Sequence, residues 1–218
     1  MPIWLTVLSW VCLLAGVASA LWIAIDLVRG HARKMWIMNI VWTVTGLYAG
    51  PLALWAYYRF GRADRATGDR PAWQGICLSA SHCGGGCTLA DLIVETSLIF
   101  APALALFGQE IFAAWALDYA AAFVIGIAFQ YFSIHPMSDA SPAADLWAAV
   151  KADTLSLTSW QVGMYGWMAI ATFAIFGHPI DKTGPVFWFM MQIAMLFGFA
   201  TAYPVNAWLI RVGIKESM

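Results

Sequence analysis

The chain has 218 residues, of which 62% are hydrophobic and 11% are charged. A water-soluble globular domain carries about 45–50% apolar and about 25% charged residues, so the composition excludes that class and predicts a polytopic membrane protein whose partner is the lipid bilayer. The formal net charge of −1 provides no basic surface for nucleic acid, so we expect no nucleic-acid partner.

Six stretches are long and apolar enough to form transmembrane helices, each of which needs about 20 mostly apolar residues. They lie near residues 3–28, 35–58, 89–107, 111–132, 160–176 and 186–210. These stretches leave little chain for a soluble domain. The sequence therefore predicts an all-α fold, a single domain over residues 1–218 that forms a bundle of about six transmembrane helices.

Six spans would place both termini on the same side of the membrane. The basic residues on that side would be Arg59, Arg62, Arg65, Arg70, Lys151, Arg211 and Lys215, against Arg29, Arg33, Lys34 and Lys182 on the other. Because cytoplasmic loops carry the excess of Lys and Arg, this topology predicts cytoplasmic termini.

Chemistry-bearing residues concentrate between the second and third predicted spans, where residues 81–88 read Ser-His-Cys-Gly-Gly-Gly-Cys-Thr. Consecutive glycines permit tight turns and close backbone approach, so we expect a loop here. Thr88 and Asp91 have the spacing of a capping box, which predicts a helix from Leu89 onward. Cys87 would then lie at the positive end of a helix dipole, where a thiolate is favoured.

Five residues in and after this loop are candidate metal ligands: His82, Cys83, Cys87, Asp91 and Glu95. One imidazole and two thiols suit a soft transition metal such as copper, zinc or iron. Asp91 and Glu95 are four residues apart, so they would project from one helix face. The spacing is not the repeated Cys-x2-Cys of structural zinc sites, and a tight turn with cysteines as small packing residues stays open as an alternative.

Two further acids lie in or beside apolar stretches. Asp118 is the only charged residue within residues 113–129, and Asp153 precedes the fifth predicted span. Carboxylates at membrane depth are costly and usually face a bundle interior, a water-filled cavity or a partner, so Asp118 and Asp153 are candidates for a proton or ion path. The sequence leaves open whether they converge with Asp91 and Glu95.

Three segments together carry a family resemblance: the motif at residues 81–88, Lys-Ala-Asp-Thr-Leu-Ser-Leu at 151–157 and Gln-Val-Gly-Met-Tyr-Gly-Trp-Met at 161–168. They resemble an uncharacterised family of bacterial integral-membrane proteins with a Ser-His-Cys-Gly-x-Gly-Cys signature, from about Trp73 onward. The resemblance implies several helices in the bacterial inner membrane and implies no activity.

These observations favour a membrane protein that handles a soft metal such as copper, as a transporter or metal-loading factor. In this interpretation the loop captures the ion, and the intramembrane carboxylates pass the ion or a coupled proton. One alternative is a metal- or thiol-dependent membrane enzyme acting on an apolar substrate. Another is an accessory subunit of a larger membrane complex, and a homo-oligomer is also open.

Overall fold

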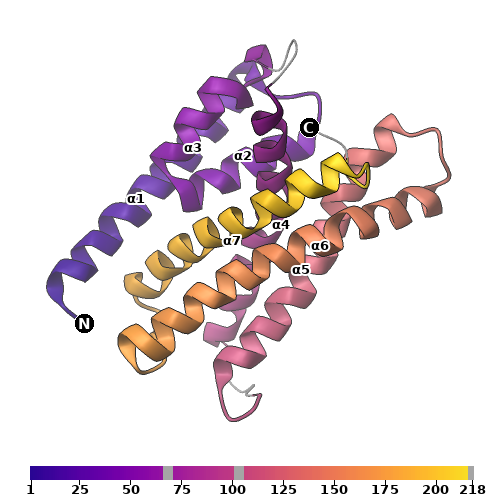
Figure 1. Ribbon diagram of the computed structural model, residues 1–218. Coiled ribbons are helices and arrows are strands. Elements are labelled where there is room, and N and C mark those ends of the chain that lie inside the picture. The colour runs from indigo at the N-terminus through magenta and orange to yellow at the C-terminus, as the bar shows by residue number, and fades with distance from the viewer. Residues whose placement is uncertain (66–70, 101–105, 216–218) are drawn as a thin grey trace.

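A computed structural model describes residues 1–65, 71–100 and 106–215, apart from the side chain of residue 137. These residues form helices joined by short links, with no strand among them, so the all-α prediction is confirmed (Figure 1). The helices are α1 (Ile3–Asp26), α2 (Trp36–Ala49), α3 (Pro51–Ala56), α4 (Ala72–Phe100), α5 (Glu110–Ile134), α6 (Pro142–Ala169) and α7 (Pro185–Arg211). Wider π-helical turns extend three of them, α1 over Leu27–His31, α3 over Tyr57–Gly61 and α6 over Ile170–Phe176.

Four of the described helices are long and apolar enough to cross a membrane, α1 with its extension, α4, α5 and α7. The expected number of six is therefore wrong. The fifth predicted span belongs to α6, which is of similar length and packs along α5 and α7, but its first half carries polar residues such as Lys151 and Asp153. The third span was predicted over residues 89–107, whereas α4 begins 17 residues earlier at Ala72; residues 101–105 lie outside the described chain.

The second predicted span, residues 35–58, is a helical hairpin instead of a single helix. Gly50 separates α2 from α3 with φ 52° and ψ −128°, a backbone conformation that glycine adopts without a steric penalty. Pro51 then starts α3, where its missing N–H costs nothing. α2 runs back along α1, so that Gly46 packs on Ala20, and α3 returns toward the end of α1 at Asp26. The hairpin therefore enters and leaves at one end of the bundle.

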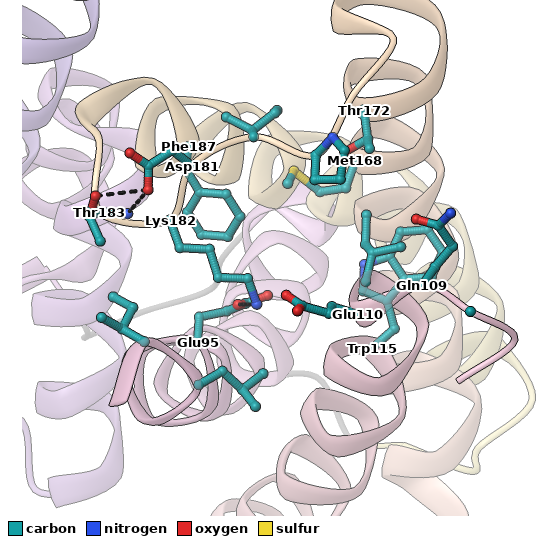
Figure 2. A pocket seen from close by; sticks show the side chains of 16 residues that line it. Glu95, Gln109, Glu110, Trp115, Met168, Thr172, Asp181, Lys182, Thr183 and Phe187 are labelled. Carbon is teal, nitrogen blue, oxygen red and sulfur yellow. Dashed lines mark hydrogen bonds and ion pairs between the residues drawn. The ribbon is translucent and has the colours of Figure 1, made fainter. Parts of the chain in front are cut away.

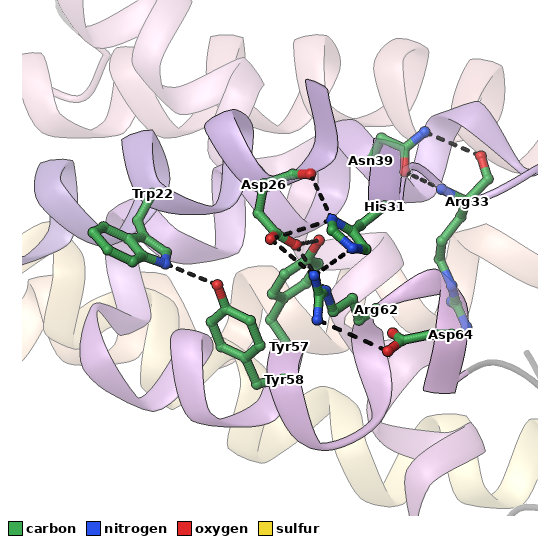
Figure 3. Close-up of polar contacts among 9 residues, drawn as sticks. All are labelled: Trp22, Asp26, His31, Arg33, Asn39, Tyr57, Tyr58, Arg62 and Asp64. Carbon is green, nitrogen blue, oxygen red and sulfur yellow. Dashed lines mark hydrogen bonds and ion pairs between the residues drawn. The ribbon is translucent and has the colours of Figure 1, made fainter. Parts of the chain in front are cut away.

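A cluster of polar side chains closes this hairpin onto the end of α1 (Figure 3). The Tyr57 hydroxyl donates to Asp26 Oδ2 at 2.8 Å, and the Arg62 guanidinium donates to both Asp26 oxygens, from Nε at 3.0 Å and from Nη2 at 3.2 Å. His31 lies beside both, with Nδ1 3.4 Å from Asp26 Oδ1. Bidentate pairing of arginine with a carboxylate fixes geometry, so the cluster holds the return of the hairpin in place.

Because the hairpin does not run the full length of the bundle, α1, α4, α5, α6 and α7 follow it lengthwise in alternating directions, and α1 begins at the opposite end of the bundle from the end of α7 (Figure 1). This arrangement does not agree with the expectation that both termini share a side, and the side of the membrane on which each terminus lies stays a prediction. The apolar content of residues 35–58 suggested a single membrane-crossing helix. The turn at Gly50 instead sends the chain back toward the end of the bundle from which it came.

The predicted loop at residues 81–88 is also wrong, because these residues form the middle of α4. Thr88 does not cap a helix, and its hydroxyl donates to the Gly84 carbonyl oxygen at 2.7 Å. Glycine in a helix interior costs about 1 kcal/mol relative to alanine, which is why the sequence favoured a loop. Packing around α4 outweighs that cost.

Each of the three glycines lies against a different neighbouring helix. A Cβ on Gly84 would be 2.2 Å from the Trp160 ring of α6, and one on Gly85 would be 3.1 Å from Val41 of α2. A Cβ on Gly86 would be 3.3 Å from the Cα of Gly126 on α5. The glycine segment, residues 84–86, therefore lets three helices approach α4 closely and makes it the central helix.

We expect Gly84→Ala to lower the Tm of the detergent-purified protein. The new methyl group would overlap Trp160, which is fully buried, and overpacking of this kind costs about 1–3 kcal/mol. Gly166→Ala on α6 is the matched control, because nothing lies within 4 Å of its Cβ position. Equal Tm values for the two variants, measured by thermal denaturation, would contradict this account of the glycine segment.

Candidate functional site

Polar side chains on α4 recur every fourth residue and are all buried: Ser79, Cys83, Cys87, Asp91 and Glu95. Residues four apart lie one above the other on one helix face. With a rise of 1.5 Å per residue, this stripe extends for about 24 Å, close to the thickness of a bilayer core of about 30 Å. The expectation that Asp91 and Glu95 share a helix face is confirmed.

Three carboxyl groups gather toward the later end of this stripe. Asp118 of α5 interacts electrostatically with both Asp91 and Glu95. Both oxygens of Asp91 and Oδ1 of Asp118 are buried without a hydrogen-bond partner. Glu95 is paired with Lys182, whose Nζ lies 2.5 Å from Oε2. Among the described residues, these three buried acids have one ammonium group near them, that of Lys182, which interacts with Glu95 and Asp118.

Asp153 lies apart from these three acids, further along the stripe. Cys87 neighbours both Asp91 and Cys83, and the Cys83 thiol in turn neighbours Asp153 of α6. Both oxygens of Asp153 are buried, and neither has a hydrogen-bond partner at an ordinary hydrogen-bonding distance and angle. Asp153 therefore connects to the other acids through the two thiols.

Lys215 closes the far end of the stripe. Its Nζ donates to Asn206 Oδ1 at 2.8 Å and to the Ser79 carbonyl oxygen at 3.4 Å, and it interacts electrostatically with Asp153. Lys182 and Lys215 flank α7 at its two ends. We call the whole series the buried polar row: Lys182, Glu95, Asp118, Asp91, Cys87, Cys83, Asp153 and Lys215. The row follows the bundle from one end to the other.

At the Lys182 end the row meets a groove of about 540 Å³, which we call the acidic vestibule. Figure 2 shows the Lys182 ammonium directed at Glu95, with Glu110 from the start of α5 on its far side. Asp181 also lines the groove, and hydrogen bonds from the backbone N–H and hydroxyl of Thr183 hold the pKa of Asp181 below its usual value. With three acids and one lysine, the vestibule attracts cations.

The five predicted metal ligands divide between two faces of α4. Cys83, Cys87, Asp91 and Glu95 lie on the row, whereas the His82 ring points to α5, with Nε2 2.9 Å from Ser133 Oγ and its edge against Phe129. Within the part of the chain that the structure describes, no three His, Cys, Asp or Glu side chains form a group that could hold a metal ion. Metal binding by the predicted set stays a prediction.

Sequence reasoning missed both lysines of the row, as well as Ser79 and Glu110. The four-residue period from Ser79 to Glu95 was visible, but the assumed loop interrupted it. Neither lysine is marked by a local pattern, because each meets α4 only through the path of α7.

Among known families, the one described as Domain of unknown function (DUF4396) matches residues 72–215. This range covers α4 to α7 and contains every residue of the buried polar row, whereas α1 and the hairpin precede it. No curated protein and no solved structure matches the chain.

We expect Lys182→Gln to make Glu95 reactive toward dicyclohexylcarbodiimide, which modifies protonated carboxyl groups in apolar surroundings. Without the ammonium at 2.5 Å, the buried carboxyl loses its counter-charge and becomes neutral by taking up a proton. Labelling of the α4 peptide, measured by mass spectrometry, should rise several-fold. Lys182→Arg keeps the charge and should label like the wild type; equal labelling of all three proteins would contradict the pairing.

Proposed function

We propose that this chain, which belongs to the DUF4396 family, conducts protons across a membrane along the buried polar row. The observation that carries the proposal is the burial of Asp91, Asp118 and Asp153 with unpartnered oxygens, between a lysine at each end of the bundle. Ionisable side chains at membrane depth are expensive and characteristically form proton relays or ion pathways.

The tight packing around the row favours protons over hydrated ions. A Cβ on Gly126 would lie 2.2 Å from Asp153 Oδ2, so α5 leaves little space beside this carboxyl group. Carboxyl groups and thiols take up and release protons, so a proton can move between neighbouring groups without the room that a hydrated metal ion needs. Cys83 and Cys87 supply the connection between Asp153 and the other acids.

The distribution of basic residues supports a direction for the path. The hairpin brings residues 29–34 to the same end of the bundle as residues 59–65, and Arg211 and Lys215 end the described chain there as well (Figure 1). By the positive-inside rule this end is cytoplasmic, which puts the acidic vestibule and the N-terminus outside. In this orientation the end of α7 is cytoplasmic and the N-terminus is outside, whereas the sequence predicted cytoplasmic termini. The membrane in this proposal is a bacterial inner membrane.

We expect Asp118→Asn to abolish proton flux, because an amide cannot take up and release a proton at the position of the row that faces both Glu95 and Asp91. The measurement is acidification of proteoliposomes, followed with an internal pH dye under an imposed membrane potential. Asp139→Asn, which removes an exposed acid between α5 and α6, is the matched control and should conduct like the wild type. Unchanged flux in the Asp118 variant would rule out the proposed path.

A soft-metal function is a second candidate, and one observation favours it. Cys83 and Cys87 lie one helical turn apart with interacting thiols, and the sulfur of buried Met195 lies 3.5 Å from Oγ1 of Thr88, the residue that follows Cys87. Thiol and thioether ligands select Cu(I) among biological metals. In this second proposal the thiols hold the ion, and the carboxyl groups of the row carry a coupled proton.

For this second candidate we expect the wild type to retain about one equivalent of Cu(I) or Ag(I) after desalting, because two thiols suffice for a linear soft-metal site. The double variant Cys83→Ser, Cys87→Ser should retain none. Cys12→Ser on α1 is the matched control, since Cys12 lies outside the row. Elemental mass spectrometry gives the stoichiometry, and equal metal in the double variant and the control would exclude the thiols as ligands.

A further inference from the structure

We propose that a second cavity, beside the middle of the buried polar row, binds a lipophilic monovalent cation with Asp91 as its counter-ion. The cavity has a volume of about 280 Å³ and lies between α1, α2, α4 and α7. Because Asp91 belongs to the row, this inference rests on the proposed proton path and names a substrate that would be coupled to it.

The walls of this cavity are almost entirely apolar, which sets the character of the ligand. They are formed by Leu13, Val17, Leu47, Leu92, Trp188, Met191 and Met195. Val17 is 46% exposed on the outer surface of α1, the surface that faces lipid in a membrane, so the cavity borders the bilayer. A ligand that reaches this site therefore partitions from the membrane and carries apolar groups.

Two buried polar groups that line the cavity have no partner. Asp91 is 1% exposed with both oxygens unpartnered, and Tyr48 is 6% exposed with an unpartnered hydroxyl. The other polar side chains at the cavity are engaged, Thr88 with the Gly84 carbonyl oxygen and Gln192 with that of Leu47. A buried polar group without a partner costs about 1–3 kcal/mol, and a ligand that interacts with Asp91 recovers part of this cost.

The charges around Asp91 select a cation. Its acidic neighbours are Glu95 on α4 and Asp118 on α5, and the basic group that the described residues place near them, Lys182, is already bound to Glu95. A monovalent cation at Asp91 supplies the missing positive charge, whereas an anion would be repelled and a neutral apolar molecule would leave the carboxylate unpaired. The Trp188 and Tyr48 rings add cation–π attraction.

Cation and proton compete for the same carboxyl group, which couples the ligand to the path. Where Asp91 is protonated before the cation binds, its O–H bond breaks, the resulting carboxylate pairs with the cation, and the proton leaves along the row. The ionisable groups that face Asp91 or line the cavity with it are Cys87 and Glu95 on α4, Asp118 on α5, Tyr165 on α6 and Tyr48 on α2. Binding should therefore weaken as the pH falls and Asp91 becomes protonated.

The test is isothermal titration of detergent-purified protein with benzyltrimethylammonium, beside neopentylbenzene, its neutral isostere. We expect the wild type and Asp139→Asn to bind the cation and Asp91→Asn to lose at least about tenfold in affinity, or 1.4 kcal/mol. Titration in buffers of different ionisation enthalpy should show release of up to about one proton per cation bound. Affinity that is equal in wild type and Asp91→Asn, or equal for cation and isostere, would overturn the inference.

Asp118→Asn separates this inference from the proton path, because Asp118 does not line the cavity. If the site and the path both exist, this variant binds the cation within a few-fold of wild type and conducts no protons. Retained flux in it overturns the path, whereas lost selectivity for the cation overturns the site. If Asp91→Asn does not fold, Leu92→Trp fills the cavity while keeping the carboxyl group and should abolish binding; unchanged binding would overturn the inference.

Discussion

The close packing of three helices around the glycine segment of α4 is the constraint on which the rest of the structure depends. Trp160, Val41 and Gly126 occupy the space that side chains at residues 84–86 would need. α4 is therefore enclosed by α2, α5 and α6, and its polar stripe faces other helices instead of lipid or water. The packing that makes α4 central also buries the carboxyl groups of the row.

Burial then determines the chemistry available to the row. Lys182 and Lys215 neutralise its two ends, while the acids between them keep unpartnered oxygens. The positive charge that these buried acids need, and that the two lysines do not supply, has to come from protons or bound cations. The acidic vestibule reaches Glu95 from the end of the bundle, and the second cavity reaches Asp91 from the lipid-facing side. A single cluster can thus meet a proton from one direction and a lipophilic cation from another.

The hairpin of α2 and α3 gives the molecule its polarity. The turn at Gly50 and the hydrogen bonds from Tyr57 and Arg62 to Asp26 return the chain to the end at which it entered. An odd number of lengthwise passes follows, and the basic segments on either side of the hairpin gather at one end (Figure 1). The acidic vestibule lies at the other end, so the row runs between surfaces of opposite charge.

Composition and helical period, both properties of the sequence alone, determined the all-α fold, the presence of helices long and apolar enough to cross a membrane, and the shared face of Asp91 and Glu95. Residue type and 3.6-residue periodicity are local properties. Only the tertiary structure decided that residues 84–86 continue a helix and that residues 35–58 turn back. Helix propensity disfavours glycine by about 1 kcal/mol, and contacts distant in sequence outweigh it here. The same holds for Lys182 and Glu95, which meet only because α7 begins beside the later end of α4.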